Sequence, residues 1–273
     1  MDDAIRAMTC LMIDPELHGM LIKGPSGSGK SSLIHSFSGA ITGKRARVSP
    51  LNITDEQLFG CINIEKALTT GTIELEKGIL GEDGQIILVD DVNLLPRNTS
   101  LQIMESVQRG TVSVEREGLS TTYRCNMKVV ATANDREQPL SPSLSDLFDI
   151  CVIIPRDPDR YKRVDVMNAS SPDKDQDIQI DGDLLGRIED AKRIVEKVMI
   201  PDEVLKAIVD TCDRFGVQGM RGAISAARVC RASASLDGRE TVNEDDLTFA
   251  LKVCIPHRRS RLVKVKEEPE DKV

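Results

Sequence analysis

Two adjacent carboxylates, Asp90 and Asp91, end the apolar segment IILVDD at residues 86–91. Carboxylate oxygens bind Mg²⁺, and proteins commonly hold this ion through one or two acids next to a phosphate site. The second acid stands where many nucleotide hydrolases carry a glutamate that polarises water. The pair therefore raises the question of whether the protein hydrolyses a nucleotide or only binds one.

A glycine-rich loop precedes these acids. The segment GPSGSGKS at residues 24–31 matches the phosphate-loop pattern G-x-x-x-x-G-K-S. In such a loop the backbone N–H groups surround phosphates, the lysine reaches the β- and γ-phosphates, and the serine hydroxyl binds Mg²⁺. We predict that the nucleotide-binding residues are Gly24, Pro25, Ser26, Gly27, Ser28, Gly29, Lys30, Ser31 and Ser32, and that Ser31 and Asp90 bind the metal. The alternative is a glycine-rich turn without a ligand.

A third polar position follows the apolar segment VVATA. Asn134 comes directly after it, and a side-chain amide at the end of a strand beside the loop can position an attacking water. We therefore predict that Asp91 and Asn134 are catalytic residues. The alternative for Asn134 is an ordinary asparagine in a turn after a strand.

The elements around these residues read as an α/β fold. An apolar strand, GMLIK, leads into the glycine-rich loop, and a helical segment follows, which is the beginning of a parallel sheet. Further apolar strands are expected at 86–90, 128–132 and 150–154, with helices at 3–13 and 99–109 and a β-hairpin at 111–123.

The second part of the chain reads as helical. Helices are expected at 183–198, 201–215, 219–236 and 243–254, and the polar segment before them is typical of a linker. The predicted domains are a nucleotide-binding α/β domain at 1–165, a linker at 166–181, a helical lid at 182–255 and a charged tail at 256–273.

Composition narrows the classes of partner. The formal net charge is −8, with 36 Lys and Arg against 44 Asp and Glu, which argues against a nucleic-acid partner. The sequence contains no run of 18 apolar residues, so we expect no membrane span and a cytoplasmic location. Seven dispersed cysteines and three histidines make a structural zinc site improbable.

The chain resembles the AAA+ ATPase subunits of magnesium chelatases and the related cobalt chelatases. The resemblance runs from about residue 14 to 259 and is most specific in IELEKGILGEDGQIILVDDVNLL, followed by GTVSVEREGLS. It implies a P-loop AAA+ parallel sheet flanked by helices, with a small C-terminal all-helical lid domain, and ATP and Mg²⁺ as cofactors.

The resemblance also implies roles and partners. Arg221, in GMRG, would be the second-sensor arginine that touches the γ-phosphate, and Asn134 the first sensor. The chain would form a homo- or hetero-hexameric ring with another AAA+ subunit and would drive a large porphyrin-binding subunit. Hairpin insertions at about 73–84 and 111–123 would face the pore of the ring or its partners.

Two positions depart from the hydrolysing subunit of that family. The family pattern has D-E where this chain has Asp90-Asp91, and D-R-F where Leu147 replaces the arginine finger. An arginine finger is worth roughly 10³–10⁵ in rate. Both changes predict weak hydrolysis by the chain alone and suit the D-type subunit, although a divergent I-type subunit stays open. Four nearby arginines are candidates to replace the finger: Arg136, Arg156, Arg160 and Arg163.

Three hypotheses follow for the function. The first is an ATP-dependent motor subunit of a metal chelatase. The second is a non-hydrolysing regulatory subunit that binds nucleotide and supports a heteromeric ring. The third is a remodelling chaperone of the MoxR-like kind.

Overall fold

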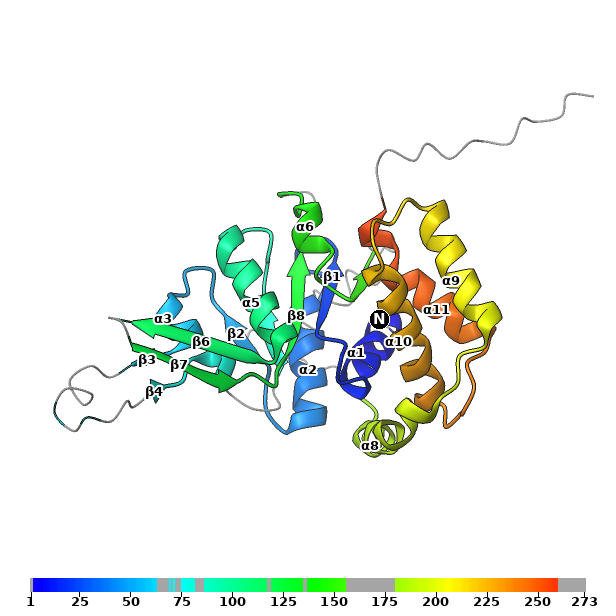
Figure 1. The fold of residues 1–273 in the computed structure, drawn as a ribbon, viewed down its shortest axis with the longest axis horizontal. Helices are drawn as coiled ribbons and strands as arrows, with labels where there is room; N and C mark the ends of the chain where they lie inside the picture. Colours follow the sequence, from blue (N-terminus) through cyan, green and yellow to red (C-terminus); the bar gives the residue numbers. More distant parts are fainter. Residues whose placement is uncertain are drawn as a thin grey trace, which may run out of the picture.

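The computed structural model describes residues 2–62, 69, 71, 75–81, 86–116, 119–134, 137–155 and 180–259. A five-stranded parallel sheet in the order β2-β5-β8-β1-β9 forms its first part (Figure 1). The strands are β1 (Gly19–Lys23), β2 (Arg47–Ser49), β5 (Ile86–Val89), β8 (Lys128–Ala133) and β9 (Ile150–Ile153). The sheet and the helical second part confirm the predicted fold class.

The strand order explains why the predicted site residues lie close together. β8 lies between β1 and β5, and all three strands run in the same direction. The segments that follow these strands therefore meet at one edge of the sheet, which we call the carboxyl edge. Residues 24–31, the pair 90–91 and Asn134 all come directly after one of these three strands. Parallel sheets place their ligand sites at this edge.

Successive side chains along a strand point to opposite faces of the sheet and belong to two separate hydrophobic cores. In β1, Met20 and Ile22 belong to one cluster of buried residues, whereas Leu21 belongs to the other. The first core joins the sheet to α1 (Asp2–Ile13), α2 (Lys30–Thr42) and the helical second part. The second lies under α5 (Arg97–Arg109) and the hairpin β6–β7 (Thr111–Arg116 and Leu119–Arg124). A strand buried on both faces reads as a continuous apolar run, which is why these strands were recognisable in the sequence.

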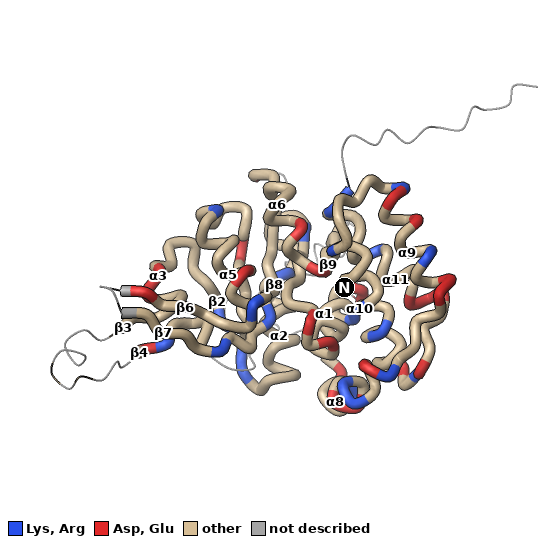
Figure 2. The backbone as a smooth tube through the Cα atoms, viewed as in Figure 1, with Lys and Arg blue, Asp and Glu red and all other residues tan. Residues whose placement is uncertain are grey.

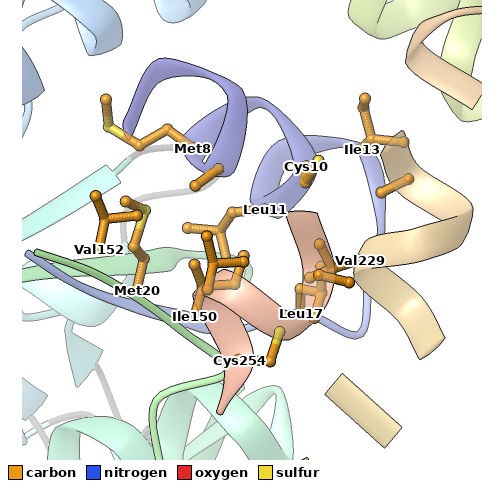
Figure 3. Packing of buried hydrophobic residues seen from close by; sticks show 14 of the residues in the cluster. Met8, Cys10, Leu11, Ile13, Leu17, Met20, Ile150, Val152, Val229 and Cys254 are labelled. Atoms are coloured by element: carbon orange, nitrogen blue, oxygen red, sulfur yellow. The ribbon is translucent and has the colours of Figure 1, made fainter. Parts of the chain in front are cut away.

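The helical part, which we call the lid, packs on the sheet through α1. Its helices are α8 (Leu184–Ile194), α9 (Asp202–Arg214), α10 (Arg221–Leu236) and α11 (Glu244–Cys254). α1 contacts β1 and β9 on one side and α10 on the other (Figure 1). Figure 3 shows the shared core, where Leu11 of α1 and Ile150 of β9 lie close to Val229 and Cys254 of the lid.

Smaller elements lie at the far end of the sheet from the lid. They are α3 (Asp55–Phe59), a two-stranded sheet of β3 (Cys61–Ile62) and β4 (Leu75–Glu76), and the hairpin β6–β7. The predicted hairpin at 111–123 is therefore present. The predicted insertion at 73–84 falls partly outside the described residues, and its strand β4 pairs with β3. A short helix, α6 (Pro142–Ser145), precedes β9.

Most predicted boundaries agree with the elements to within a few residues. The predicted helix at 183–198 divides into α8 and a 3₁₀ turn at Val195–Lys197. The predicted linker at 166–181 lies outside the described residues except for its last two positions. In the described part of the chain, no helix is long and apolar enough to cross a membrane. Figure 2 shows basic and acidic residues interspersed along the lid helices.

Candidate nucleotide site

The glycine-rich loop has the backbone that a phosphate loop requires. Gly27 and Gly29 have φ angles of +73° and +78°, in the left-handed region that favours glycine. A Cβ atom at Gly24 would lie 2.8 Å from the backbone oxygen of Ile154, so a larger residue does not fit there. α2 begins directly after the loop, and its N-cap residue, Gly29, has no side-chain cap. The first N–H groups of α2 are therefore directed towards the loop and lack a capping side chain.

Lys30 lies inside this loop. Its side chain is 6% exposed, and its ammonium donates hydrogen bonds to the backbone oxygens of Gly24 (3.0 Å) and Pro25 (2.8 Å). A buried ammonium held by two carbonyl oxygens keeps its charge in a fixed place at the mouth of the loop. This is the position from which a lysine can bind phosphate oxygens.

Ser31 and Asp90 meet across the sheet edge. The Ser31 hydroxyl donates to Oδ1 of Asp90 at 3.0 Å, and the Thr132 hydroxyl donates to the same oxygen. Thr132 is fully buried in β8, and its hydroxyl also accepts a hydrogen bond from the backbone N–H of Asp91 at 2.9 Å. Thr132 therefore holds both acidic residues in place. A serine hydroxyl beside a carboxylate is the donor set that Mg²⁺ takes in phosphate-loop proteins.

Asp91 has an unusual backbone and a perturbed carboxyl group. Its φ angle is +49°, and among the described residues it is the one non-glycine with a positive φ. Aspartate tolerates this conformation better than longer side chains do. Burial raises the pKa of the Asp91 carboxyl, the charges of Asp90 and Glu137 raise it further, and Lys30 acts to lower it. Two other carboxylates therefore share this edge with Asp91.

Asn134 lies against the loop. Its Nδ2 atom donates to the hydroxyl of Ser26 at 3.2 Å and to Oε1 of Glu137 at 2.7 Å. The Ser26 hydroxyl in turn donates to Oε1 of Glu137 at 3.1 Å. The loop after β1 and the segment after β8 are thus joined through three polar side chains.

The described residues fit ATP with Mg²⁺. The loop offers backbone donors and one ammonium, and the hydroxyl of Ser28 is buried without a hydrogen-bond partner. A buried polar atom that lacks a partner is rare in a folded protein and calls for an explanation, which a bound phosphate oxygen supplies. No cluster of three or more His, Cys, Asp or Glu side chains suited to a metal is found within the described part of the chain. A cation here would therefore depend on phosphate oxygens as well as on Ser31 and Asp90.

The structure does not bring Arg221 to this site. The backbone N–H of Asp149 donates to Gly19 at the first residue of β1, whereas the loop follows the last residue of that strand. Arg221 pairs with Asp146, close to Asp149, at 3.0 Å. With a rise of about 3.3 Å per residue, the two ends of the five-residue strand β1 are roughly 13 Å apart. Arg221 therefore lies at the opposite, amino edge of the sheet, and its second-sensor role remains a prediction.

Leu147 is part of the second core. Its side chain is 9% exposed, and its backbone oxygen accepts a hydrogen bond from Gln108 at 3.0 Å. A leucine in this place contributes to packing rather than to charge. The four arginines considered as replacements for a finger all lie outside the described residues.

Two residues of the site were not predicted from the sequence, namely Thr132 and Glu137. A polar residue inside the apolar segment VVATA was a signal for Thr132, because a fully buried hydroxyl needs a partner. Glu137 follows Asn134 by three residues in an irregular segment, and nothing in the local pattern distinguishes it from a solvated acid.

Comparisons with known proteins match both parts of the chain. Residues 19–148 match the profile of an AAA domain of the dynein-related subfamily, and residues 205–273 match that of an AAA lid domain. The fold also resembles the crystal structure of a candidate ATPase from Cytophaga hutchinsonii, with a TM-score of 0.67 at 21% identity over 94% of this chain and 82% of that one.

Two similar proteins are magnesium-chelatase subunits. The 67 kDa subunit of Chlorobaculum tepidum is 31% identical over 99% of this chain, which spans only 44% of that longer protein. The 38 kDa subunit of Cereibacter sphaeroides is 29% identical over 94% of this chain and 89% of its own length. The chain belongs to the AAA+ ATPases, as an AAA domain followed by an AAA lid, and is related to the magnesium-chelatase subunits.

Proposed function

We propose that the chain is an ATP-binding AAA+ ring subunit of a metal chelatase of the magnesium or cobalt type. It couples nucleotide binding and hydrolysis to metal insertion into a tetrapyrrole, which a large porphyrin-binding partner subunit carries out. The ring is a homo- or hetero-hexamer with another AAA+ subunit. The likeness to two magnesium-chelatase subunits supports this proposal.

One observation carries the proposal. The buried ammonium of Lys30, the Ser31–Asp90 hydrogen bond and the Asn134–Ser26 hydrogen bond all lie at the carboxyl edge of one sheet. Three segments distant in sequence thus supply a cation, a metal-binding pair and a polar amide. This combination is what positioning and charge stabilisation of a phosphoryl group require.

Each residue of the site has its own role in the proposed binding and hydrolysis of ATP. Bound ATP supplies a phosphoanhydride whose cleavage is favourable. Lys30 and the loop N–H groups bind its phosphates, while Ser31 and Asp90 hold Mg²⁺. Asn134 orients the attacking water, and Asp91 accepts a proton from it, for which a raised pKa is favourable.

A second candidate function has its own support. Asp91 is one methylene shorter than glutamate, and Leu147 is buried in the core where the family carries an arginine. Both features support a regulatory subunit that binds nucleotide and supports the ring without turning over ATP itself. A MoxR-like remodelling role remains the third hypothesis.

Steady-state hydrolysis and assembly state separate these functions. The chain is assayed alone and with an I-type chelatase subunit, while light scattering follows its mass with and without ATP and Mg²⁺. We expect larger assemblies with nucleotide, weak hydrolysis alone, and a rise in hydrolysis on mixing. Assembly without that rise would favour the regulatory subunit, and a chain that stays monomeric under all conditions would contradict both.

A further inference from the structure

Glu137 occupies a position at the carboxyl edge that the proposed function leaves unexplained. Its carboxylate oxygen Oε1 accepts hydrogen bonds from Ser26 of the loop and from Asn134 after β8. The backbone N–H of Glu137 also donates to the backbone oxygen of Asn134 at 3.0 Å, which holds these two residues close together. One carboxylate thus bridges the phosphate loop and the predicted sensor asparagine.

The charge of this carboxylate is directed into the site. Glu137 is close enough to Asp91 to contribute to the raised pKa of that acid, and Asp90 adds a third negative charge. Lys30 is the cation among the described residues that acts on Asp91. Among the described residues that act on Asp91, two negative charges therefore stand against one positive charge before any nucleotide adds its own.

The two donors held by Glu137 are those that a terminal phosphate needs. Ser26 lies in the loop and Asn134 follows the neighbouring strand, and the hydrogen bond between them places both side chains beside the loop that would bind the phosphates. A hydroxyl or an amide N–H cannot serve the carboxylate and a phosphate oxygen fully at the same time. Since Glu137 is exposed to solvent, its side chain can rotate away without disturbing the core.

We propose that Glu137 determines the preference of this site between nucleoside triphosphate and diphosphate. Its carboxylate competes with the terminal phosphate for Ser26 and Asn134 and repels it electrostatically. The diphosphate does not reach these donors and is bound without this cost. The inference rests on the proposed function, because it assumes that the loop binds a nucleotide.

Binding measurements with two nucleotides test the proposal. Dissociation constants for ADP and for a non-hydrolysable ATP analogue, each with Mg²⁺, are measured for the wild-type chain and for Glu137→Gln. The glutamine keeps the shape and an acceptor oxygen but removes the charge. We expect the analogue to bind about tenfold more tightly, because one unit charge a few ångströms from the phosphate is removed. The affinity for ADP should change less than twofold.

Three further comparisons distinguish competition for the donors from a purely structural role of Glu137. Glu137→Ala removes the acceptor as well, and it should shift the preference between the nucleotides in the same direction. Glu115→Gln, at an exposed position of β6 remote from the loop, should leave both affinities unchanged. Added salt should raise the affinity for the triphosphate analogue relative to ADP more in the wild-type chain than in Glu137→Gln, since only the wild-type chain retains the repulsion that salt screens.

The outcomes that would overturn the inference differ from those that would overturn the function. Equal changes for both nucleotides, or weaker binding of the ATP analogue to Glu137→Gln, would show that Glu137 only supports Asn134 and would overturn the inference alone. A wild-type chain that binds neither nucleotide would overturn the proposed function and this inference with it.

Discussion

The two edges of the sheet use polar side chains in opposite ways. At the carboxyl edge, the loop N–H groups lack a capping side chain and the Ser28 hydroxyl lacks a partner. At the amino edge, Asp146 and Asp149 are tied to the lid by three side chains. The Arg258 guanidinium binds both residues, Arg221 pairs with Asp146, Ser225 donates to Asp149, and the His257 ring contacts the backbone oxygen of Phe148.

The carboxyl edge therefore has polar groups available to bind a ligand, whereas the polar groups of the amino edge hold the lid against the sheet. The buried guanidinium of Arg258 is hydrogen-bonded to acceptors on both sides of this contact, which fixes one arrangement of the lid on the sheet. The carboxyl edge instead keeps donors available, so its polar groups gain a complete set of partners only with a ligand. We therefore expect substitutions at the amino edge to change stability, and substitutions at the carboxyl edge to change binding and turnover.

The largest expected effect is at the amino edge. Arg258 is buried, and its guanidinium donates to Asp146 and to the backbone oxygens of Phe148, Asp149 and Cys254. Arg258→Met keeps most of the apolar stem but leaves the three backbone oxygens and the partly exposed Asp146 carboxylate without their donor. We expect the free energy of unfolding to fall by about 3 kcal/mol, the lower end of the range for breaking a buried ion pair. Urea denaturation measures the change.

A matched control is available on α8. Arg193 pairs with Asp190 at 3.0 Å on the surface, with 77% of its side chain exposed, so Arg193→Met should change stability by less than about 0.5 kcal/mol. The nucleotide affinity of folded Arg258→Met should equal that of the wild-type chain. A large loss of affinity with normal stability would mean that the two edges are not separate.

The next largest effect is at the carboxyl edge, where a substitution should weaken nucleotide binding instead of lowering stability. Lys30→Ala removes the ammonium from the loop, and the phosphate charge then loses its main cationic partner. Truncating one partner of a buried charge pair costs about 2–5 kcal/mol, so ATP affinity should fall by about 100-fold or more. Titration with a fluorescent ATP analogue measures this. Lys44→Ala, at an exposed position after α2, is the control, and unchanged affinity in Lys30→Ala would refute the phosphate-loop assignment.

The two edges also differ in how far the sequence predicts them. The residues of the carboxyl edge can be predicted from local sequence patterns. Once a parallel strand is identified, the residue that follows it must lie at that edge. This reasoning places Lys30, Asp90 and Asn134 together. It misses β2, whose three residues include two exposed ones and give no apolar run.

The amino edge depends on how the lid packs, which no local pattern encodes. The start of α10 is readable as a helix terminus, but its position next to Asp146 results from the packing of α10 on α1 and from Arg258. The family resemblance predicted Arg221 at the nucleotide, whereas the structure places it beside Asp146 at the other edge. The burial of Leu147 likewise depends on tertiary packing beneath α5 and α6.

The smallest predicted effect concerns the acid that opened the sequence analysis. Asp91→Glu extends the carboxylate by one methylene towards the site, and misplacement of about 1 Å can cost about 10²-fold in rate. We expect kcat to rise by about tenfold, with little change in nucleotide affinity, because the added reach acts in the transition state. Single-turnover hydrolysis measures the first quantity and equilibrium binding the second.

The backbone conformation at Asp91 limits the expected rise in kcat, and a second substitution at the same position serves as the control. At a φ of +49°, glutamate is less favourable than aspartate, so Asp91→Glu should also lose about 1 kcal/mol of stability. Leu147→Arg is not an equivalent way to restore the family pattern, since it places a charge in the second core and should destabilise the fold instead. Asp91→Asn keeps the shape and removes the proton acceptor, so it should abolish the residual hydrolysis. If Asp91→Asn turns over ATP as fast as the wild-type chain, Asp91 does not activate water, and weak hydrolysis must then be explained by other residues of the carboxyl edge.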